Sequence, residues 1–205
     1  MTAINPQSDD MRGVVRATEF IGTGHVKGTM LAAHVQWVRD NRSASEYVRF
    51  WDSLPREVRT SIGMVLPVKW YDFAHLIAID RAIVELFGAG SKSVLRDLGV
   101  HSARVNLGGA YKAYTRAGIH EFFTGAARLH SQFQDFGDAV YGARSTTSGT
   151  MTHRNYTSYS PLYCESAAGY YQEAIVLHGG TDVAIYEAEC QCRGDKGCVF
   201  VMRWR

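Results

Sequence analysis

The sequence predicts an α+β fold in which N-terminal helices pack on an antiparallel sheet of two hairpins separated by a helix. Three observations carry this prediction. From about residue 28 to residue 134, apolar residues recur at intervals of three and four, which is typical of amphipathic helices. After residue 137, alternating segments rich in Thr and Tyr predict strands. Between two pairs of such segments, Ser160 and Pro161 begin one further helix.

The length of 205 residues favours one domain, which we assign to residues 14–205, behind a flexible leader at residues 1–13. Its helical part ends near residue 134, and its hairpin-helix-hairpin part covers about residues 135–205. A hydrophobic fraction of 46% is ample for a packed core and excludes the class of disordered chains. The 22 basic and 20 acidic residues nearly balance, so a nucleic-acid partner is not expected.

Neither a targeting segment nor a membrane span is expected from the sequence. The leader contains no apolar h-region, and no apolar run approaches the roughly 20 residues that cross a bilayer. We therefore expect a cytoplasmic protein, and in a reducing compartment closely spaced cysteines more often indicate a metal site than a disulfide.

The helical part begins with a strand-like segment at residues 14–21. Its clearest helix covers residues 72–87, with Asp72 as the N-cap and Gly88 as the stop. A second apolar stripe predicts one helix that extends from Phe122 to Phe136. Shorter helices are expected at residues 29–41, 44–54, 56–64, 92–98 and 105–116.

The C-terminal part reads as hairpin, helix and hairpin. Residues 139–148 and 150–158 form the first predicted hairpin, and they are joined through Ser148 and Gly149. The helix that begins at Ser160 runs to about Leu177 and stops at two glycines. The second hairpin pairs residues 182–192 with residues 198–204 around a polar turn.

The four cysteines are the main chemical signal in the sequence. Cys190, Cys192 and Cys198 flank the turn of the second predicted hairpin, so they lie close together in space. Cys164 lies in the first turn of the preceding helix, where the helix dipole favours the thiolate. Glu187 precedes Cys190 by three residues. Thiolates and a carboxylate are suitable ligands for a tetrahedral Zn²⁺.

Strand alternation complicates such a site and leaves alternatives open. Cys190 and Cys192 share one face of the predicted strand, whereas Glu187 falls on the other face. Glu187 can join the set only if a bulge lies between it and Cys190, or if its longer side chain wraps round. The alternative is that the four thiols pack in the core as small hydrophobes. A redox pair is disfavoured because the C-x-x-C spacing is absent.

The stretch from Cys164 to Trp204 resembles the C-terminal half of the 4-vinyl reductase (4VR) domain. The helix cysteine and the E-x2-C-x7-C spacing with Gly-Asp in the turn carry this resemblance. That family includes sensory domains of aromatic-responsive bacterial activators and is related to the TRAPP vesicle-tethering subunits. In the sensory domains the pattern binds one structural zinc, so the resemblance implies the ligands Cys164, Glu187, Cys190 and Cys198, with Cys192 as a non-ligand.

The segments LPVKWYDF and HSQFQDFGDAVYGA also resemble an uncharacterised family of stand-alone, paralogous myxobacterial proteins. Together these resemblances imply a zinc-stabilised sensor domain that binds a small hydrophobic or aromatic molecule. Its signal would act in trans, through a homodimer or another protein partner. A pocket between helices and sheet is where this architecture would hold such a ligand, although no pocket residue can be assigned.

Two other function classes stay open at this point. One is a scaffold subunit like the TRAPP relatives, which binds no small ligand and has a sealed core. The other is an enzyme of unknown reaction, for which the sequence offers no catalytic residue. His75 and His130 lie beside apolar stripes and could face a pocket, although a histidine bonded within the core is the commoner outcome. Heme ligation by one of the eight histidines also stays open because related folds sense gases, although no motif points to it.

Overall fold

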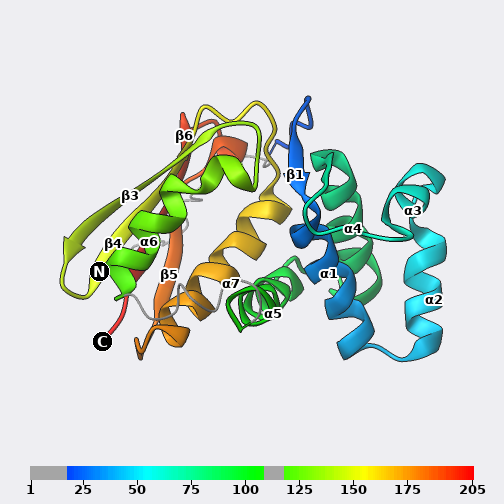
Figure 1. Cartoon of the computed structure of the whole chain (residues 1–205), viewed down its shortest axis with the longest axis horizontal. Helices are drawn as coiled ribbons and strands as arrows, with labels where there is room; N and C mark the ends of the chain where they lie inside the picture. Colours follow the sequence, from blue (N-terminus) through cyan, green and yellow to red (C-terminus); the bar gives the residue numbers. More distant parts are fainter. Residues whose placement is uncertain (1–17, 109–117) are drawn as a thin grey trace, which may run out of the picture.

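The computed structural model describes residues 18–108 and 118–205 and confirms the predicted α+β fold. Figure 1 shows a four-stranded antiparallel sheet at one end of the molecule and the N-terminal helices at the other. Two central helices lie between these layers. No helix within the described ranges is long and apolar enough to cross a membrane. The predicted leader lies outside the described residues.

The N-terminal layer contains four helices in the order that the apolar spacing predicted. They are α1 (Gly28–Asn41), α2 (Ala44–Ser53), α3 (Arg56–Ile62) and α4 (Phe73–Phe87). A short antiparallel ribbon of β1 (His25–Lys27) and β2 (Trp70–Asp72) packs beside them. Asp72 occupies the N-cap position of α4 as predicted, although its side chain makes no capping hydrogen bond within the described residues.

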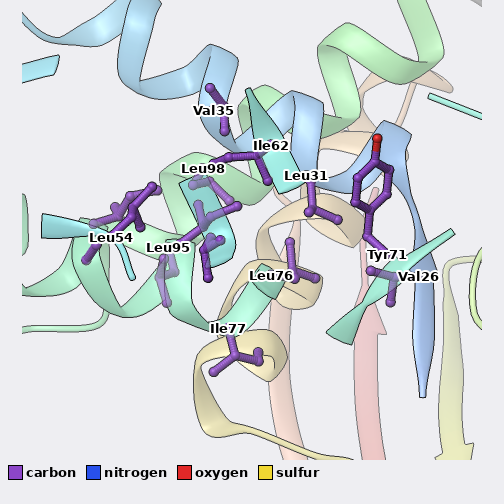
Figure 2. Close-up of a cluster of buried hydrophobic side chains, with 14 of the residues drawn as sticks. Val26, Leu31, Val35, Leu54, Ile62, Tyr71, Leu76, Ile77, Leu95 and Leu98 are labelled. Carbon is purple, nitrogen blue, oxygen red and sulfur yellow. The ribbon is translucent and has the colours of Figure 1, made fainter. Parts of the chain in front are cut away.

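Apolar side chains from each of these elements meet in one core. Figure 2 shows Val26 of β1 near Leu31 of α1 and Leu76 of α4, with Leu95 and Leu98 contributed by the next helix. All of these side chains are fully buried. Burial of apolar area at roughly 25 cal/mol per Å² is the main source of stability for such a layer.

The central helices are α5 (Val94–Gly108) and α7 (Pro161–Leu177), which cross at two glycines. A Cβ atom on Gly99 would lie 2.0 Å from the carbonyl oxygen of Ser166, and one on Gly169 would lie 2.0 Å from that of Arg96. The prediction of two separate helices at residues 92–98 and 105–116 was wrong up to residue 108. Gly99 lies inside α5 rather than at the end of a helix. Because it has no side chain, the backbones of α5 and α7 can approach each other there. Residues 109–116 lie outside the described residues.

The sheet joins the two predicted hairpins through their inner strands. Its strand order is β3-β4-β6-β5, formed by β3 (Asp138–Ser145), β4 (Ser148–Arg154), β6 (Gly197–Arg203) and β5 (Ala184–Glu189). Helix α7 connects β4 to β5 and begins as predicted, with Pro161 first and the Ser160 hydroxyl accepting from the Leu162 N–H. Helix α6 (Ile119–Arg128) packs against β3.

Two local predictions were wrong in this half of the chain. The first hairpin turns at Thr146 and Thr147 rather than at the Ser-Gly pair, which belongs to β4. A Cβ atom on Gly149 would lie 2.2 Å from the Tyr141 hydroxyl, so the Tyr141 side chain packs over this glycine. The stripe from Phe122 to Phe136 does not form one helix. Phe122 packs in the core of the sheet half, whereas Phe136 packs in the core of the N-terminal layer.

The chain leaves α6 at Arg128, makes a 3-10 turn and reaches β3. Phe136 then packs against Phe73 in the N-terminal core, with ring centroids 5.2 Å apart. The predicted strand at residues 14–21 is described only from residue 18, and there Phe20 forms an isolated antiparallel bridge with Tyr159.

Candidate functional site

A cavity of about 190 Å³ lies where the N-terminal helices meet the sheet half of the molecule. Helices α1, α5, α6 and α7 and the inner face of the sheet all contribute to its walls. Most of the lining is apolar or aromatic and includes Met30, Leu107, Phe122, Phe123, Leu129 and Met151. Apolar cavities of about 150 Å³ hold a benzene-sized molecule. The space therefore suits a ligand of about one ring.

Small residues on the two central helices leave this volume unfilled. On α5, Gly99, Ser102 and Asn106 follow one another at intervals of three and four, which places them on one face. On α7, Ser166 and Ala167 also line the cavity. The sequence predicted a pocket between helices and sheet, but it assigned no lining residues to it. The spacing of small and polar residues along α5 was the available signal, and the expectation of a helix break at that point concealed it.

Two histidines on the cavity wall are bonded to buried tyrosines. The Nε2 atom of His130 lies 2.6 Å from the Tyr156 hydroxyl, and that of His153 lies 2.6 Å from the Tyr171 hydroxyl. Burial lowers the pKa of His130 and lowers the pKa of His153 to about 3. Both imidazoles are therefore neutral near pH 7. His130 lines the cavity, whereas His75 is not among the described residues that do so.

A third histidine lines the cavity from helix α1. The Nδ1 atom of His34 lies 2.6 Å from Oδ1 of Asp80, and Asp80 is completely buried. A carboxylate at Nδ1 fixes the proton on that nitrogen and leaves Nε2 as an acceptor. The other carboxylate oxygen of Asp80 has no hydrogen-bond partner in the described part of the chain.

Gln134 carries an unpaired amide nitrogen at the cavity wall. Its Oε1 accepts hydrogen bonds from the hydroxyls of Tyr156 and Tyr163, at 3.2 Å and 3.0 Å. Its Nε2 has no partner among the described residues, and the side chain is only 3% exposed. Ser102 is 5% exposed, and its hydroxyl is likewise unpaired within the described ranges. Both residues line the cavity.

The structure brings the four predicted metal ligands together at a second place. One ligand atom from each of Cys164, Glu187, Cys190 and Cys198 lies within 4.8 Å of all the others. The Cys164 sulfur is 3.6 Å from that of Cys198 and 4.0 Å from that of Cys190. The bulge that Glu187 required is present, because the β5–β6 register shifts between Glu187 and Glu189. Cys192 is buried in a short 3-10 turn outside this set.

The electrostatics of this cluster favour one thiolate among protonated neighbours. Hydrogen bonds from the other thiols, that of Cys164 first, lower the pKa of Cys190. The same contacts, led by the one with Cys190, raise the pKa of Cys164. Burial raises the pKa of Glu187, whose Oε2 lies 3.0 Å from Nη1 of Arg193. All four cysteines of the chain are free.

The fold is similar to solved structures of H-NOX proteins. An H-NOX protein from S. oneidensis in the Fe(II)NO ligation state matches with a TM-score of 0.68 and 12% identity, covering 87% of this chain and 99% of that one. An Fe(II) unliganded H-NOX protein from K. algicida matches with a TM-score of 0.65 and 10% identity, covering 87% and 96%. An oxygen binding H-NOX domain related to soluble guanylate cyclases gives 0.60 and 14%, covering 87% and 95%.

No family model matches the sequence. No curated protein matches it either. At 10–14% identity, the structural likeness shows the fold alone.

This comparison corrects the family that the sequence suggested. The resemblance to the 4-vinyl reductase domain, and with it the relation to TRAPP subunits and to the myxobacterial family, was wrong, because the fold matches H-NOX proteins over 87% of the chain. Apart from the cysteine on α7, the motif that carried the resemblance describes a turn between β5 and β6. Such a turn brings its own cysteines together in any fold that contains it.

The zinc cofactor that rested on this resemblance was also wrong. The matching proteins are described by Fe(II) and by heme rather than by zinc. Sulfur contacts of 3.6–4.0 Å are also what buried free thiols make when they pack as small hydrophobes. The assignment of Cys164, Glu187, Cys190 and Cys198 as ligands of a metal ion stays a prediction.

The described residues do not fit a heme. The cavity of about 190 Å³ is smaller than the roughly 300–1,000 Å³ of pockets that hold drug-sized ligands, and a porphyrin exceeds most such ligands. Heme carboxylates call for Arg or Lys partners, and neither residue type is among the described lining residues. Of the three imidazoles at the wall, those of His130 and His153 place Nε2 against tyrosine hydroxyls, and that of His34 keeps Nε2 as an acceptor. Among the described residues, the cavity volume and the lack of cationic partners therefore argue against a heme.

Proposed function

We propose that this domain binds a small, mainly apolar molecule, about the size of one ring, directly in the cavity and acts as a sensor of it. The cavity itself is the observation that carries the proposal. It is bounded by both halves of the molecule and lined by apolar side chains, with a few polar groups among them. The H-NOX likeness supports the proposal, since those proteins are described in oxygen-bound and NO-bound states.

An occupant of the cavity would connect elements from both halves of the chain. Met30 and His34 reach it from α1, while Met151 and His153 reach it from β4. A ligand that binds only this arrangement stabilises it over any looser one, by mass action. This coupling between the helical layer and the sheet is the sensing step that we propose. The output acts in trans, through a homodimer or another protein, in a cytoplasmic setting.

The cavity argues against the scaffold alternative, which required a sealed core. We favour a binding domain over an enzyme because most of the described lining is apolar or aromatic. A binding domain needs only shape and a few hydrogen-bonding groups, which the lining provides.

Two neighbouring alanines of α6 allow a sharp test. Ala126 lines the cavity, whereas Ala127 is half-buried and is not among the described lining residues. We expect ethylbenzene to raise the melting temperature of the wild-type protein and of Ala127→Leu, but not of Ala126→Leu, whose larger side chain fills the space. Differential scanning fluorimetry and calorimetric titration measure this. Equal responses from the two variants, or no binding of ring-sized molecules by the wild type, would contradict the proposal.

A further inference from the structure

Two polar groups at the cavity wall lack the partners that buried groups normally have. These are Nε2 of Gln134 and Oγ of Ser102, neither of which has a hydrogen-bond partner among the described residues. Their side chains are 3% and 5% exposed. Because the great majority of buried polar atoms in native proteins are hydrogen-bonded, two orphans in one cavity indicate a missing partner. Ordered water or a molecule bound in the cavity can supply that partner.

The orientation of the Gln134 amide is set by its neighbours. The hydroxyls of Tyr156 and Tyr163 both donate to its Oε1. Burial raises the pKa of both phenols, so they stay protonated donors across the ordinary pH range. With the carbonyl end committed, the amide presents its N–H groups as the unpaired end, and these can only donate.

The Ser102 hydroxyl differs from that of its neighbour across the helix crossing. Ser166 also lines the cavity, but its hydroxyl donates to the backbone oxygen of Tyr163 at 3.0 Å. Serines within helices usually make such a backbone bond. Ser102 makes none within the described residues, so its O–H is available as a second donor.

The charges of the lining residues further restrict the class of ligand that the cavity can bind. No Arg or Lys is among the described residues of the wall. From the described residues, an anion in this apolar space would gain no counter-charge for its lost hydration, which is strongly unfavourable. An occupant that satisfies two donors and carries no charge needs an acceptor oxygen. A carbonyl oxygen has two lone pairs and can accept from both donors at once.

We propose that the cavity recognises a neutral, ring-sized carbonyl compound, such as a ketone, an aldehyde or an ester, whose oxygen accepts from Gln134 Nε2 and Ser102 Oγ. This inference rests on the proposed binding function and names its ligand class. The apolar lining holds the ring, and the two donors distinguish the carbonyl compound from a hydrocarbon of the same shape.

Acetophenone and ethylbenzene form a matched pair of probes, because they differ at one carbon that carries either an oxygen or two hydrogens. By calorimetric titration of the wild-type chain, we expect acetophenone to bind about tenfold more tightly, as one net hydrogen bond provides. Benzoate, the charged analogue, should not bind.

Three variants locate the source of this preference. Ser102→Ala removes an unpaired hydroxyl and should reduce the preference severalfold without weakening ethylbenzene binding. Gln134→Met should also reduce the preference, because it leaves Ser102 as the one remaining donor of the two. Ser53→Ala is the matched control, because its hydroxyl already donates to the backbone oxygen of Phe50 at 2.7 Å and Ser53 is not among the described lining residues, and it should keep the full preference.

The outcomes separate this inference from the function on which it rests. Equal binding of the two probes by the wild type, or a preference that survives Ser102→Ala unchanged, overturns the carbonyl assignment and leaves the cavity function standing. Failure of both probes to bind the wild type overturns both. Because Ser102→Ala removes only an unpaired group, it keeps the test decisive even where Gln134→Met does not fold.

Discussion

The Nδ1 atom of His34 lies 2.6 Å from Oδ1 of Asp80, and this pair links α1 to α4 beneath the cavity wall. Both side chains are buried, at 4% and 0% exposure, so neither can recover hydrogen bonds from water if its partner is removed. The pair therefore fixes how His34 is presented to the cavity, and it makes the two helices depend on each other.

Asp80→Ala should lower the free energy of unfolding by about 3–5 kcal/mol, because it leaves the His34 ring buried without its partner. Replacing both residues, as His34→Phe with Asp80→Leu, should cost much less than the single change, since no polar group is then stranded. Urea unfolding of the two variants measures the difference. A double variant as unstable as Asp80→Ala would show that the pair contributes through packing alone.

Gly99→Ala should destabilise the protein by about 3 kcal/mol, the upper part of the range for overpacked sites. The added Cβ atom would lie 2.0 Å from the backbone oxygen of Ser166, so the helices must separate. Gly125→Ala in α6 is the control, because a Cβ atom there meets no described atom within 4 Å. It should stabilise the protein by roughly 0.5–1 kcal/mol. Thermal and urea unfolding test both, and a neutral Gly99→Ala would disprove the close crossing.

Lowering the pH should reduce the free energy of unfolding through protonation of His153. Its pKa is about 3 in the folded state because of burial, against about 6.5 in the unfolded chain. Between these values only the unfolded state takes up the proton, so the free energy of unfolding falls as the pH is lowered through this window. From pH 7 to pH 5 the loss from this group is about 2 kcal/mol.

The variant His153→Gln isolates this effect, because its amide can still bond the Tyr171 hydroxyl but does not titrate. Its stability should fall less between pH 7 and pH 5 than that of the wild type, as followed by urea unfolding at each pH. Identical pH profiles for the two proteins would mean that His153 takes up its proton in the folded state.

The four-residue ligand assignment makes its own prediction about metal content. If Cys164, Glu187, Cys190 and Cys198 hold a metal ion, Cys190→Ser should lose it, whereas Cys192→Ser should keep it. Elemental analysis of protein purified under reducing conditions without chelator compares the two variants with the wild type. Wild-type protein free of metal under these conditions would leave the cluster as packed thiols.

Elements with a strong local signal were predictable from the sequence. The Ser160 cap followed by Pro161 fixed the start of α7, and the spacing of apolar residues located α1 to α4. A helix break at Gly99 and a turn at Gly149 were predicted wrongly, because glycine is found both in turns and where chain segments pack closely. Only the partner backbone or ring, which lies far away in sequence, tells these uses apart.

The two candidate sites differ in the same way. The cysteine cluster was predictable because three of its members flank one turn and therefore approach each other by local geometry. The cavity draws Ser102 from α5 and Gln134 from the segment before β3, and no sequence spacing connects the two residues. Its polar atoms become conspicuous only when their missing hydrogen bonds can be counted, which requires the whole fold.

The strand order β3-β4-β6-β5 has a consequence for how the chain folds. Each outer pair is a local hairpin that closes a short loop, and such hairpins form in microseconds. The central pairing, in which Met151 lies opposite Phe200, must close a loop that contains all of α7. Loop-closure entropy makes this non-local step the slow one. We therefore expect β4, which carries the cavity residues Met151 and His153, to pair with β6 last, after both hairpins and α7 have formed.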